Sequence, residues 1–395
     1  MLLTHKIELK PNRIQATYFQ KACGVARFSY NWALAEWKKQ YEQGLKPKES
    51  ELRKTLNQIK NTEFPWMIEV TKVAPQQAIK NLGTAFKRFF TQQGAYPKFK
   101  KKGIHEAFRA DNGPVNAHEN AVPLENKKIK LPKIGWVRLT EKLRFEGRIQ
   151  SVTISKRAGR WFAAVNVDSE KLPHERKNQG SVGVDLGIKH LAVLSDGQKI
   201  EGPKAYGSLL VRLRRTSKAL SRKVKGSENR RKAKELLAKL HAKIAHIREN
   251  SLHQLSTYLV LNHTKIGIED LNVSGMQKNR KLSRHIMDQG FSEFRRQLTY
   301  KAKWYGSEIT VADRFYPSSK NCHLCGEKNE ALTLKDRHWI CRCGALHDRD
   351  INAAKNLEKL ATASSAGIQA CREESAGSRQ KSTVKLRLVE AGIQH

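Results

Sequence analysis

Two short apolar stretches of the chain carry an acidic residue two positions after a glycine. Gly183 is followed by Asp185 and Gly187 in the first stretch, and Gly267 is followed by Glu269 in the second. The intervening residues are apolar, so the period of two predicts strands with one buried face and one bare face that bears a single acid. Two strands with the same pattern predict one shared site.

A third acidic pattern stands at the start of a helical run near the C-terminal end. Asp348 and Asp350 begin it, and the small residues Ala353 and Ala354 follow, which would let the helix pack closely on a sheet. Residues two positions apart cannot share a helix face, so only one of the two acids can join the strand acids. The pattern alone does not choose between them.

Converging carboxylates define the chemistry that such a site could perform. A buried acid is costly unless it is paired or binds a metal ion, and three acids in one place repel one another unless Mg²⁺ relieves the repulsion. Phosphodiester cleavage uses such a set, in which two ions about 4 Å apart activate water and stabilise the leaving oxygen. Any one of these acids alone would fit a turn residue or a hydrogen-bonded core carboxylate. The three together, with the glycines and the helix start, favour a site for two Mg²⁺ ions.

A second metal site is predicted from cysteine spacing. Four of the six cysteines form two pairs separated by fifteen residues, which fits a tetrahedral Zn²⁺ site of the ribbon type rather than a disulfide framework. The second pair has one intervening residue instead of two. The predicted ligands are Cys322, Cys325, Cys341 and Cys343, with His323, His338 and His347 as substitutes.

Composition predicts a polyanionic partner. The 395 residues include 75 Lys and Arg against 37 Asp and Glu, a formal charge of +38, and the pI is about 10.1. The mean hydropathy is -0.64, no apolar run approaches a transmembrane length, and no secretory signal opens the chain. Nucleic acid is therefore favoured over a membrane surface, and a cytoplasmic location is expected.

The first half of the chain predicts a small β-barrel interrupted by helices. A strand over residues 5–10 is followed by helical patterns up to Gly44, over 52–59 and over 75–90. These helical segments are rich in aromatic residues. Most of the aromatic side chains are expected in the core, and a minority could stack on bases. Short strand-like runs follow, and residues 3–10 would pair with them. The runs cover residues 129–131, 136–139, 150–154 and 161–167.

The second half predicts an α/β unit with a basic helical pair. The strand with Asp185 begins a hairpin, and two long helical runs between 206 and 260 are broken at Gly226. Between Lys204 and Arg248 fifteen Lys and Arg stand against two acids, which predicts phosphate contacts. The candidates are Arg212, Arg214, Arg215, Arg222 and Lys223.

The order of these motifs resembles one family. A strand acid, a second strand acid, a zinc ribbon and a helix-start acid are typical of a RuvC-like, RNase H type nuclease with a ribbon inserted before its last helix. The chain resembles the TnpB (OrfB) family of insertion-sequence transposons, which is related to type V CRISPR effectors. The segments that carry the resemblance are 27–31, 183–187, 268–271, 317–322 and 347–354.

The resemblance implies a multidomain α/β protein that cleaves DNA. It implies that Asp185, Glu269 and Asp350 hold the Mg²⁺ ions and that Asp348 caps the helix. It implies an RNA from the transposon end that guides cleavage of double-stranded DNA beside a short motif. Base pairing with the RNA reads the target sequence, and the protein reads the adjacent motif. One chain is expected to bind each RNA, in the prokaryotic cytoplasm at the nucleoid. Lys72 and Gln76 match positions that face that motif.

The same resemblance implies a division of the chain. The expected parts are a wedge barrel (1–12 and 95–175), a helical insertion (13–94), a RuvC-like nuclease (180–314 and 346–360), a zinc ribbon (315–345) and a disordered tail (361–395).

Three other functions fit parts of the sequence. An RNA-guided DNA-binding regulator that cannot cut typically lacks one or more of the acids, whereas this chain keeps all three. A carboxylate-type transposase is compatible with the acids, but nothing resembles a tyrosine or serine nucleophile motif. A plain basic RNA-binding protein would explain the charge and the ribbon but not the two glycine-acid strands.

Overall fold

A computed structural model describes residues 1–111, 120–172, 174–177, 180–333 and 335–374. The chain divides into two compact units, each with its own sheet. One unit comprises Met1–Glu175 and Leu209–Ala245, and the other comprises Arg176–Ser208 and His246–His395. In the described part of the chain, no helix combines the length and the apolar character needed to cross a membrane.

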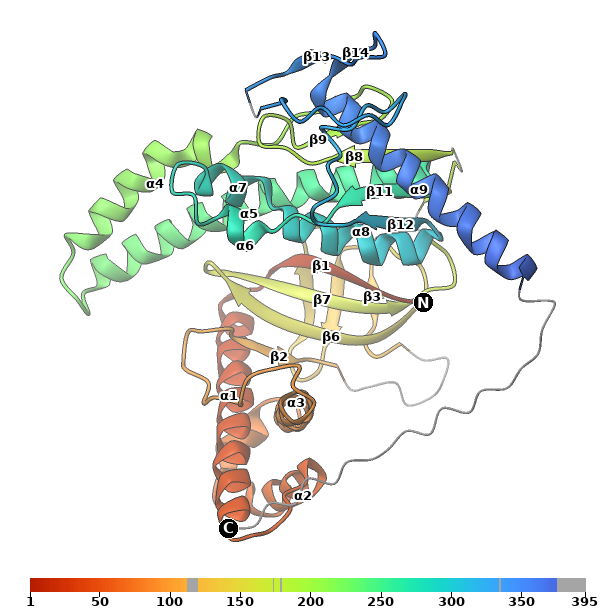
Figure 1. Cartoon of the computed structure of the whole chain (residues 1–395). Coiled ribbons are helices and arrows are strands. Elements are labelled where there is room, and N and C mark those ends of the chain that lie inside the picture. Colours follow the sequence, from red (N-terminus) through yellow and green to blue (C-terminus); the bar gives the residue numbers. More distant parts are fainter. Residues whose placement is uncertain (112–119, 173, 178–179, 334, 375–395) are drawn as a thin grey trace. The chain divides into compact units, whose positions relative to one another are not determined.

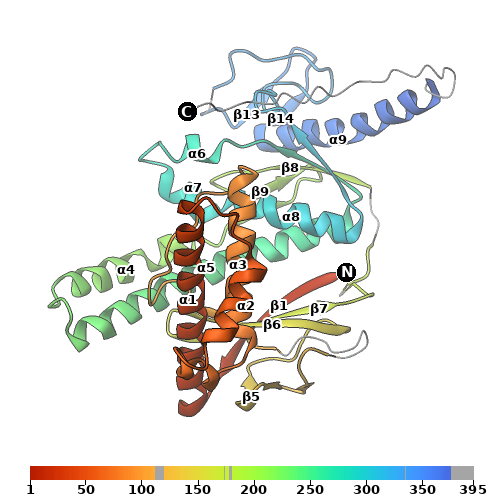
Figure 2. The ribbon, with the colours of Figure 1, turned by 90° about the horizontal axis from the view of Figure 1, so that it is seen from below.

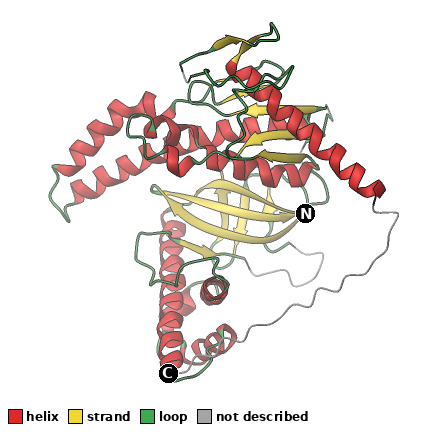
Figure 3. Ribbon diagram, in the orientation of Figure 1, coloured by secondary structure: helices red, strands yellow, loops and turns green. Residues whose placement is uncertain are grey.

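The first unit is built on a seven-stranded antiparallel sheet (Figures 1 and 3). Its order is β2-β6-β7-β1-β5-β4-β3, so β1 pairs with both β7 and β5, as the sequence predicted. The segment before β3 is hydrogen-bonded to β6: the N–H of Ala121 donates to the carbonyl of Ile149 at 2.8 Å. The strands are β1 Leu2–Lys10, β2 Ala107–Arg109, β3 Leu124–Glu125, β4 Lys128–Leu131, β5 Gly135–Leu139, β6 Arg148–Arg157 and β7 Arg160–Asp168.

Helices inserted between β1 and β2 complete this unit. A capping box starts α1, in which the N–H of Gln15 donates to Asn12 at 2.8 Å and the N–H of Asn12 donates back to the Gln15 side chain at 3.0 Å. The α1 helix lies beside α3, where the rings of Trp37 and Phe86 stack at 4.2 Å (Figure 2). The helices are α1 Arg13–Glu42, α2 Glu49–Ile59, the 3₁₀ helix η1 Pro65–Glu69 and α3 Val73–Phe90.

Two long helices connect the units in sequence. They are α4 Ala205–Ser221 and α5 Glu228–Asn262, and the break between them contains Gly226 at φ +88°, a backbone conformation that glycine adopts without a steric penalty. The predicted break at this glycine is therefore confirmed. The N–H of Tyr206 donates to the Asp288 carboxylate at 2.9 Å, which caps the start of α4.

The second unit is built on a five-stranded mixed sheet of order β10-β9-β8-β11-β12. β11 is parallel to β8 and to β12, while β8, β9 and β10 form the predicted antiparallel hairpin and its extension. The strands are β8 Ser181–Asp185, β9 Ala192–Leu194, β10 Lys199–Ile200, β11 Lys265–Glu269 and β12 Glu308–Ala312. The helices are α6 Val273–Met276, α7 Ser283–Gln289, α8 Phe291–Tyr305 and α9 Arg349–Glu374.

Between β12 and α9 lies a small insertion with a two-stranded sheet. Its strands, β13 His338–Ile340 and β14 Leu346–Asp348, are antiparallel. A small apolar cluster that includes Leu332 and Trp339 packs against two of the cysteines.

The α9 helix is longer than the sequence predicted. The expected tail was to begin at 361, but α9 continues to Glu374. Alanine recurs in this segment and is the strongest helix former, and Ala361 is also buried at the sheet. The rest of the expected tail, 375–395, lies outside the described residues.

Candidate active site and zinc centre

Two glycines let α9 lie directly on the sheet of the second unit. A Cβ at Gly183 of β8 would overlap the carbonyl oxygen of Ala354, and a Cβ at Gly267 of β11 would overlap the carbonyl oxygen of Leu357. The bare strand face predicted from the sequence is therefore the face that α9 covers (Figure 1).

The strand acids lie at the edge of that contact. Ile268 pairs with Val184 in the parallel ladder, so Glu269 and Asp185 follow side by side at the C-terminal ends of adjacent strands. Each stands two residues beyond its glycine and therefore on the face toward α9.

The carboxylate of Asp350 completes the group from the first turn of α9. Burial raises the pKa of Asp185 well above its usual range, and the negative charges of Glu269 and then Asp350 raise it further. Burial also raises the pKa of Glu269. The carboxylates of Glu269 and Asp350 therefore lie close enough to Asp185 for their charges to act on it.

Asp348 and Asp350 have different roles in the structure. One Asp348 oxygen accepts from the N–H groups of Asp350 at 3.0 Å and Ile351 at 3.2 Å, and the other pairs with Lys199 at 2.7 Å. Asp348 is thus the cap of α9. Of the two acids, Asp350 is the one whose negative charge acts on Asp185, which favours Asp350 as the third acid of the site.

Two arginines and a serine partly offset the negative charge. Arg337 lies 3.4 Å from Asp350, and the positive charges of Arg349 and Arg337 lower the pKa of Asp185. The hydroxyl of Ser318 donates to Glu269 at 2.5 Å, which opposes the effect of burial on the pKa of that carboxyl. Sequence reasoning missed Arg337, and it quoted Arg349 and Ser318 only as parts of motifs.

The donor set fits divalent magnesium, which prefers carboxylate oxygens and relieves repulsion among them. The three carboxylates are less tightly gathered than the four cysteine sulfurs, which are the one group of potential ligands within 4.8 Å of one another among the described residues. Contacts of Glu269 with Ser318 and of Asp350 with Arg337 hold two of the acids in this arrangement.

The predicted cysteine cluster is confirmed. The Sγ atoms of Cys322 and Cys343 lie 3.8 Å apart, and those of Cys325 and Cys341 lie 3.5 Å apart. Four thiolates bound at about 2.3 Å to one tetrahedral zinc would stand about 3.8 Å from one another. The geometry of the sulfurs therefore fits Zn²⁺.

Both cysteine pairs are followed at once by a glycine that closes a turn, although the turn of the second pair is one residue shorter. The N–H of Gly326 donates to the carbonyl of Cys322, and the N–H of Gly344 donates to that of Cys341, each at 2.9 Å. The two glycines have φ +80° and +85°. A left-handed glycine thus turns the chain at each knuckle, which accommodates the missing residue of the second pair.

The three candidate histidines lie around the cluster rather than in it. His347 is buried, and its Nε2 is 3.1 Å from the Cys322 sulfur. His323 contacts Asn352 at 3.0 Å, and His338 lies 3.9 Å from Asp348. Among them, His347 is placed to orient a cysteine ligand.

Asparagines one turn apart on α9 tie the ribbon to the helix. Asn356 donates to the carbonyls of Ser318 and Asn321, both at 2.7 Å, and Asn352 also donates to the Asn321 carbonyl at 2.7 Å. Polar residues four positions apart between alanines in a buried helix were a signal in the sequence that the prediction did not use.

Removing two cysteines is expected to release the zinc. The double change Cys322→Ser and Cys325→Ser should lower zinc content from about one ion per chain to near zero and expose the ribbon to proteolysis, because metal binding supplies the folding free energy of such sites. Elemental analysis of the purified chain measures this. Cys23→Ala is the matched control, since Cys23 is a buried thiol far from the cluster in sequence; equal zinc in all three proteins would contradict the assignment.

The predicted nucleic-acid contacts lie in or next to helices of the first unit, and all except the half-buried Gln76 are exposed. Lys72 immediately precedes α3, with Gln76 one turn further on, and Lys72 lines a cavity of about 520 Å³ with Lys60 and Lys133. The five basic candidates on and after α4 are all exposed: Arg212, Arg214, Arg215, Arg222 and Lys223.

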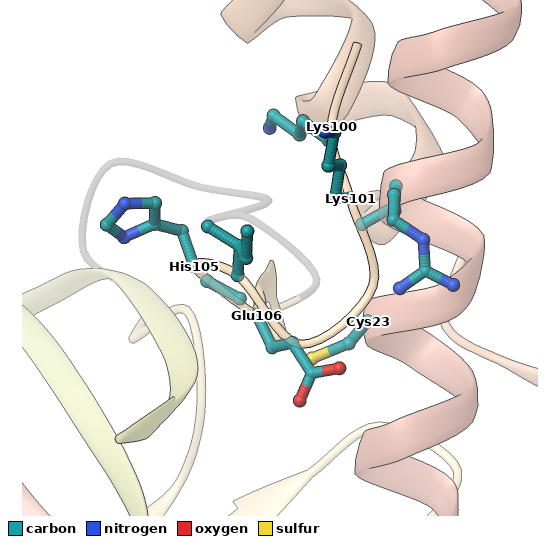
Figure 4. Close-up of a pocket in the computed structure, with 9 residues that line it drawn as sticks. Cys23, Lys100, Lys101, His105 and Glu106 are labelled. Atoms are coloured by element: carbon teal, nitrogen blue, oxygen red, sulfur yellow. The ribbon is translucent and has the colours of Figure 1, made fainter. Parts of the chain in front are cut away.

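A smaller pocket beside α1 offers no comparable chemistry. Cys23 faces Glu106 across it, with Lys100 and Lys101 on the loop above (Figure 4). The pocket encloses about 20 Å³, room for a single water molecule. Burial raises the pKa of Cys23 to about 12, so this thiol is not a nucleophile at neutral pH.

Comparison with known proteins places the chain in a family. Residues 164–280 match the OrfB_IS605 family described as "Probable transposase", and residues 291–357 match a "Cas12f1-like, TNB domain". Residues 1–46 match a "Helix-turn-helix domain", although the structure has a strand and one long helix over these residues. The fold is similar to that of Cas12f1 in a complex with sgRNA and target DNA, with a TM-score of 0.59 and 14% identity over 88% of this chain and 83% of that one.

Two relatives match almost the whole chain. A "Putative RNA-guided DNA endonuclease" of Streptomyces pristinaespiralis is 36% identical over 98% of this chain and 97% of its own length. The "Putative RNA-guided DNA endonuclease InsQ" of Escherichia coli K12 is 33% identical over 90% of this chain and 91% of its own. The chain therefore belongs to the TnpB (OrfB) family of transposon-encoded proteins.

Proposed function

We propose that this chain is an RNA-guided endonuclease that cleaves guide-matched double-stranded DNA beside a short transposon-associated motif. The observation that carries the proposal is the placement of Asp185 and Glu269 at the ends of adjacent strands, with Asp350 in the first turn of the helix that covers them, in a chain similar to proteins named as such endonucleases. The second unit then corresponds to a RuvC-like nuclease with an inserted zinc ribbon. The first corresponds to a wedge barrel with a helical insertion, which the return of Ala121 to β6 supports.

The three carboxylates would hold two Mg²⁺ ions at this site. When bound, the ions supply an activated water and stabilise the leaving oxygen of the phosphodiester. Asp185 and Glu269 provide oxygens from the rigid ends of paired strands, and Asp350 provides one from the helix start. Arg337 and Arg349 place positive charge beside the phosphate-binding position, and Ser318 orients Glu269.

Basic helices of the first unit would grip the nucleic acids. α4 contains no acidic residue. No carboxylate on the same helix therefore competes with phosphate for its exposed arginines. Lys72 and Gln76 present donors on one helix face, which suits base edges in a groove. Because the target of this function is double-stranded DNA, we place the chain at the prokaryotic nucleoid. We further expect one chain to bind each RNA.

Co-expression with the flanking transposon DNA tests the function. Purified complexes are analysed for bound RNA and then challenged with a plasmid library of randomised flanks in the presence of Mg²⁺. Depletion of plasmids that share one flank, dependent on RNA and on Asp185, is the expected result. Bound RNA and target binding without cutting would instead indicate the regulator, and absence of bound RNA would contradict the proposal.

Loss of the Ser318 hydroxyl is expected to weaken metal binding. Ser318→Ala should raise the Mg²⁺ concentration for half-maximal cleavage about 10- to 100-fold, because groups that orient metal ligands contribute that much to affinity. Ser318→Thr, which restores a hydroxyl, should recover most of the loss. Ser319→Ala is the matched control, since the neighbouring Ser319 contributes its carbonyl group to Asn352; an equal effect at Ser319 would contradict the assigned role.

A further inference from the structure

Exposed aromatic rings gather where α3 ends and the following loop begins. Phe90, Tyr96 and Phe99 are 63%, 42% and 50% exposed, although large apolar side chains normally lie inside a folded protein. Most aromatic residues of the helical insertion are in its core, as expected. Phe90, at the end of the insertion, and Tyr96 and Phe99, just after it, are exposed rings that the core does not explain.

Contacts with neighbouring rings hold Tyr96 and Phe90 in place. Tyr96 meets Phe86 edge to face at 5.6 Å and Phe89 at 5.2 Å, and Phe89 lies 5.4 Å from Phe90. Phe86 is buried and stacks on Trp37. The exposed rings of Tyr96 and Phe90 are therefore attached to an aromatic core, so little entropy is lost when something covers them.

Positive charge surrounds the rings. The Lys38 ammonium lies 5.1 Å from the centre of Phe99 and 5.7 Å from that of Tyr96. From Val70 to His105 the sequence has eight Lys and Arg and no Asp or Glu. Lys100 and Lys101, in the loop that follows Phe99, belong to this basic segment (Figure 4).

We propose that Phe90, Tyr96 and Phe99, together with Lys38, form a stacking platform for unpaired bases of the RNA. Stacking on exposed rings beside cations that contact the phosphates is the way in which proteins bind single-stranded nucleic acid. A protein partner fits less well, because the cores of protein interfaces are depleted of charge whereas the Lys38 ammonium lies over two of these rings.

The exposure of the three rings favours RNA over DNA as the bound nucleic acid. The inference rests on the proposed function, in which RNA is bound before any target is met. Three large rings left in water throughout that period would be an aggregation liability, and the resident RNA is the ligand that the proposed function supplies in the absence of a target.

Crosslinking of the resident RNA tests the position of the platform. The full chain is co-expressed with its flanking DNA, purified without target, irradiated with ultraviolet light and digested, and the peptides that carry nucleotides are identified by mass spectrometry. Crosslinks on the peptide with Tyr96 and Phe99 are expected. Crosslinks confined to other segments, or appearing at Tyr96 only after target DNA is added, would overturn the assignment to RNA.

Oligonucleotide binding tests the chemistry. The probes are an oligouridylate of about 15 nucleotides and an abasic ribose-phosphate chain of equal length and charge. The wild-type chain should bind the base-bearing probe more tightly, and Phe90→Ala or Phe99→Ala should each reduce that preference about 5- to 100-fold, while the abasic probe is unaffected. Tyr96→Phe retains its ring and should retain the preference.

Trp136→Ala is the matched control, because Trp136 is an exposed ring on β5 of the same unit. Equal binding of the two probes by the wild type, or an equal loss in the Trp136 variant, would overturn the platform. This binding assay does not depend on cleavage. A chain that binds the base-bearing probe more tightly than the abasic probe but cuts no DNA would contradict the proposed function alone. A chain that cuts DNA but binds both probes equally would contradict the platform alone.

Discussion

Replacing Asp185 with asparagine is expected to reduce target cleavage by about a thousandfold or more while RNA binding is unchanged. Asparagine has nearly the same shape, so β8 and its packing under α9 remain, but the negative charge that would hold a divalent ion is lost. Metal ions contribute several kcal/mol to stabilising the charge that develops in phosphodiester cleavage. Single-turnover cleavage of a matched plasmid, with RNA binding measured in parallel, gives both quantities.

The acids at the start of α9 provide an internal control for this prediction. Asp350→Asn should reduce cleavage to a similar extent, whereas Asp348→Asn should leave cleavage within a few-fold of wild type, because asparagine caps a helix about as well as aspartate. The two positions are two residues apart, so a general disturbance of the helix start would affect both alike. Loss of cleavage in Asp348→Asn with retention in Asp350→Asn would reverse the assignment.

The zinc ribbon and the candidate active site are connected by short hydrogen bonds. Ser318 contacts Glu269 through its hydroxyl and Asn356 of α9 through its carbonyl, and it lies four residues before the ligand Cys322. The ribbon therefore anchors a residue that orients one of the strand acids. A ribbon unfolded by zinc loss would be expected to release Ser318 and with it the position of Glu269.

Features set by neighbouring residues were accessible from the sequence. The glycine-acid strands were readable because a period of two places Gly183 and Asp185 on one face whatever surrounds them. Cysteine spacing was equally informative, since the turn that ends at Gly326 is built within a few residues.

Features that depend on distant segments were not accessible. The contact of Ser318 with Glu269 joins residues 49 apart in the sequence, and nothing local marks either residue as the partner of the other. The role of Asp348 also needed the fold, because the N–H groups that it caps become orphaned only when α9 starts there. The boundary at 360 was wrong because falling hydrophobicity was taken as the end of structure, whereas the alanine-rich segment continues α9.

Replacing Gly183 with alanine is expected to disrupt the second unit although it adds a single methyl group. The new Cβ would overlap the carbonyl oxygen of Ala354, and neither the strand nor the helix backbone can yield without breaking its own hydrogen bonds. Overpacking of a rigid contact costs about 1–3 kcal/mol, and more where backbone is the obstacle. Limited proteolysis should show early cleavage near α9, and target cleavage should fall with it because Asp350 is displaced from Asp185.

Gly24→Ala tests whether the effect belongs to the contact rather than to the loss of a glycine. Gly24 lies inside α1, and a Cβ there meets nothing within 4 Å. Alanine should therefore stabilise the first unit by up to about 1 kcal/mol through helix propensity. If Gly183→Ala and Gly24→Ala are equally stable and active, α9 does not lie on β8 as closely as the structure places it, and the common position of the three acids loses its physical basis.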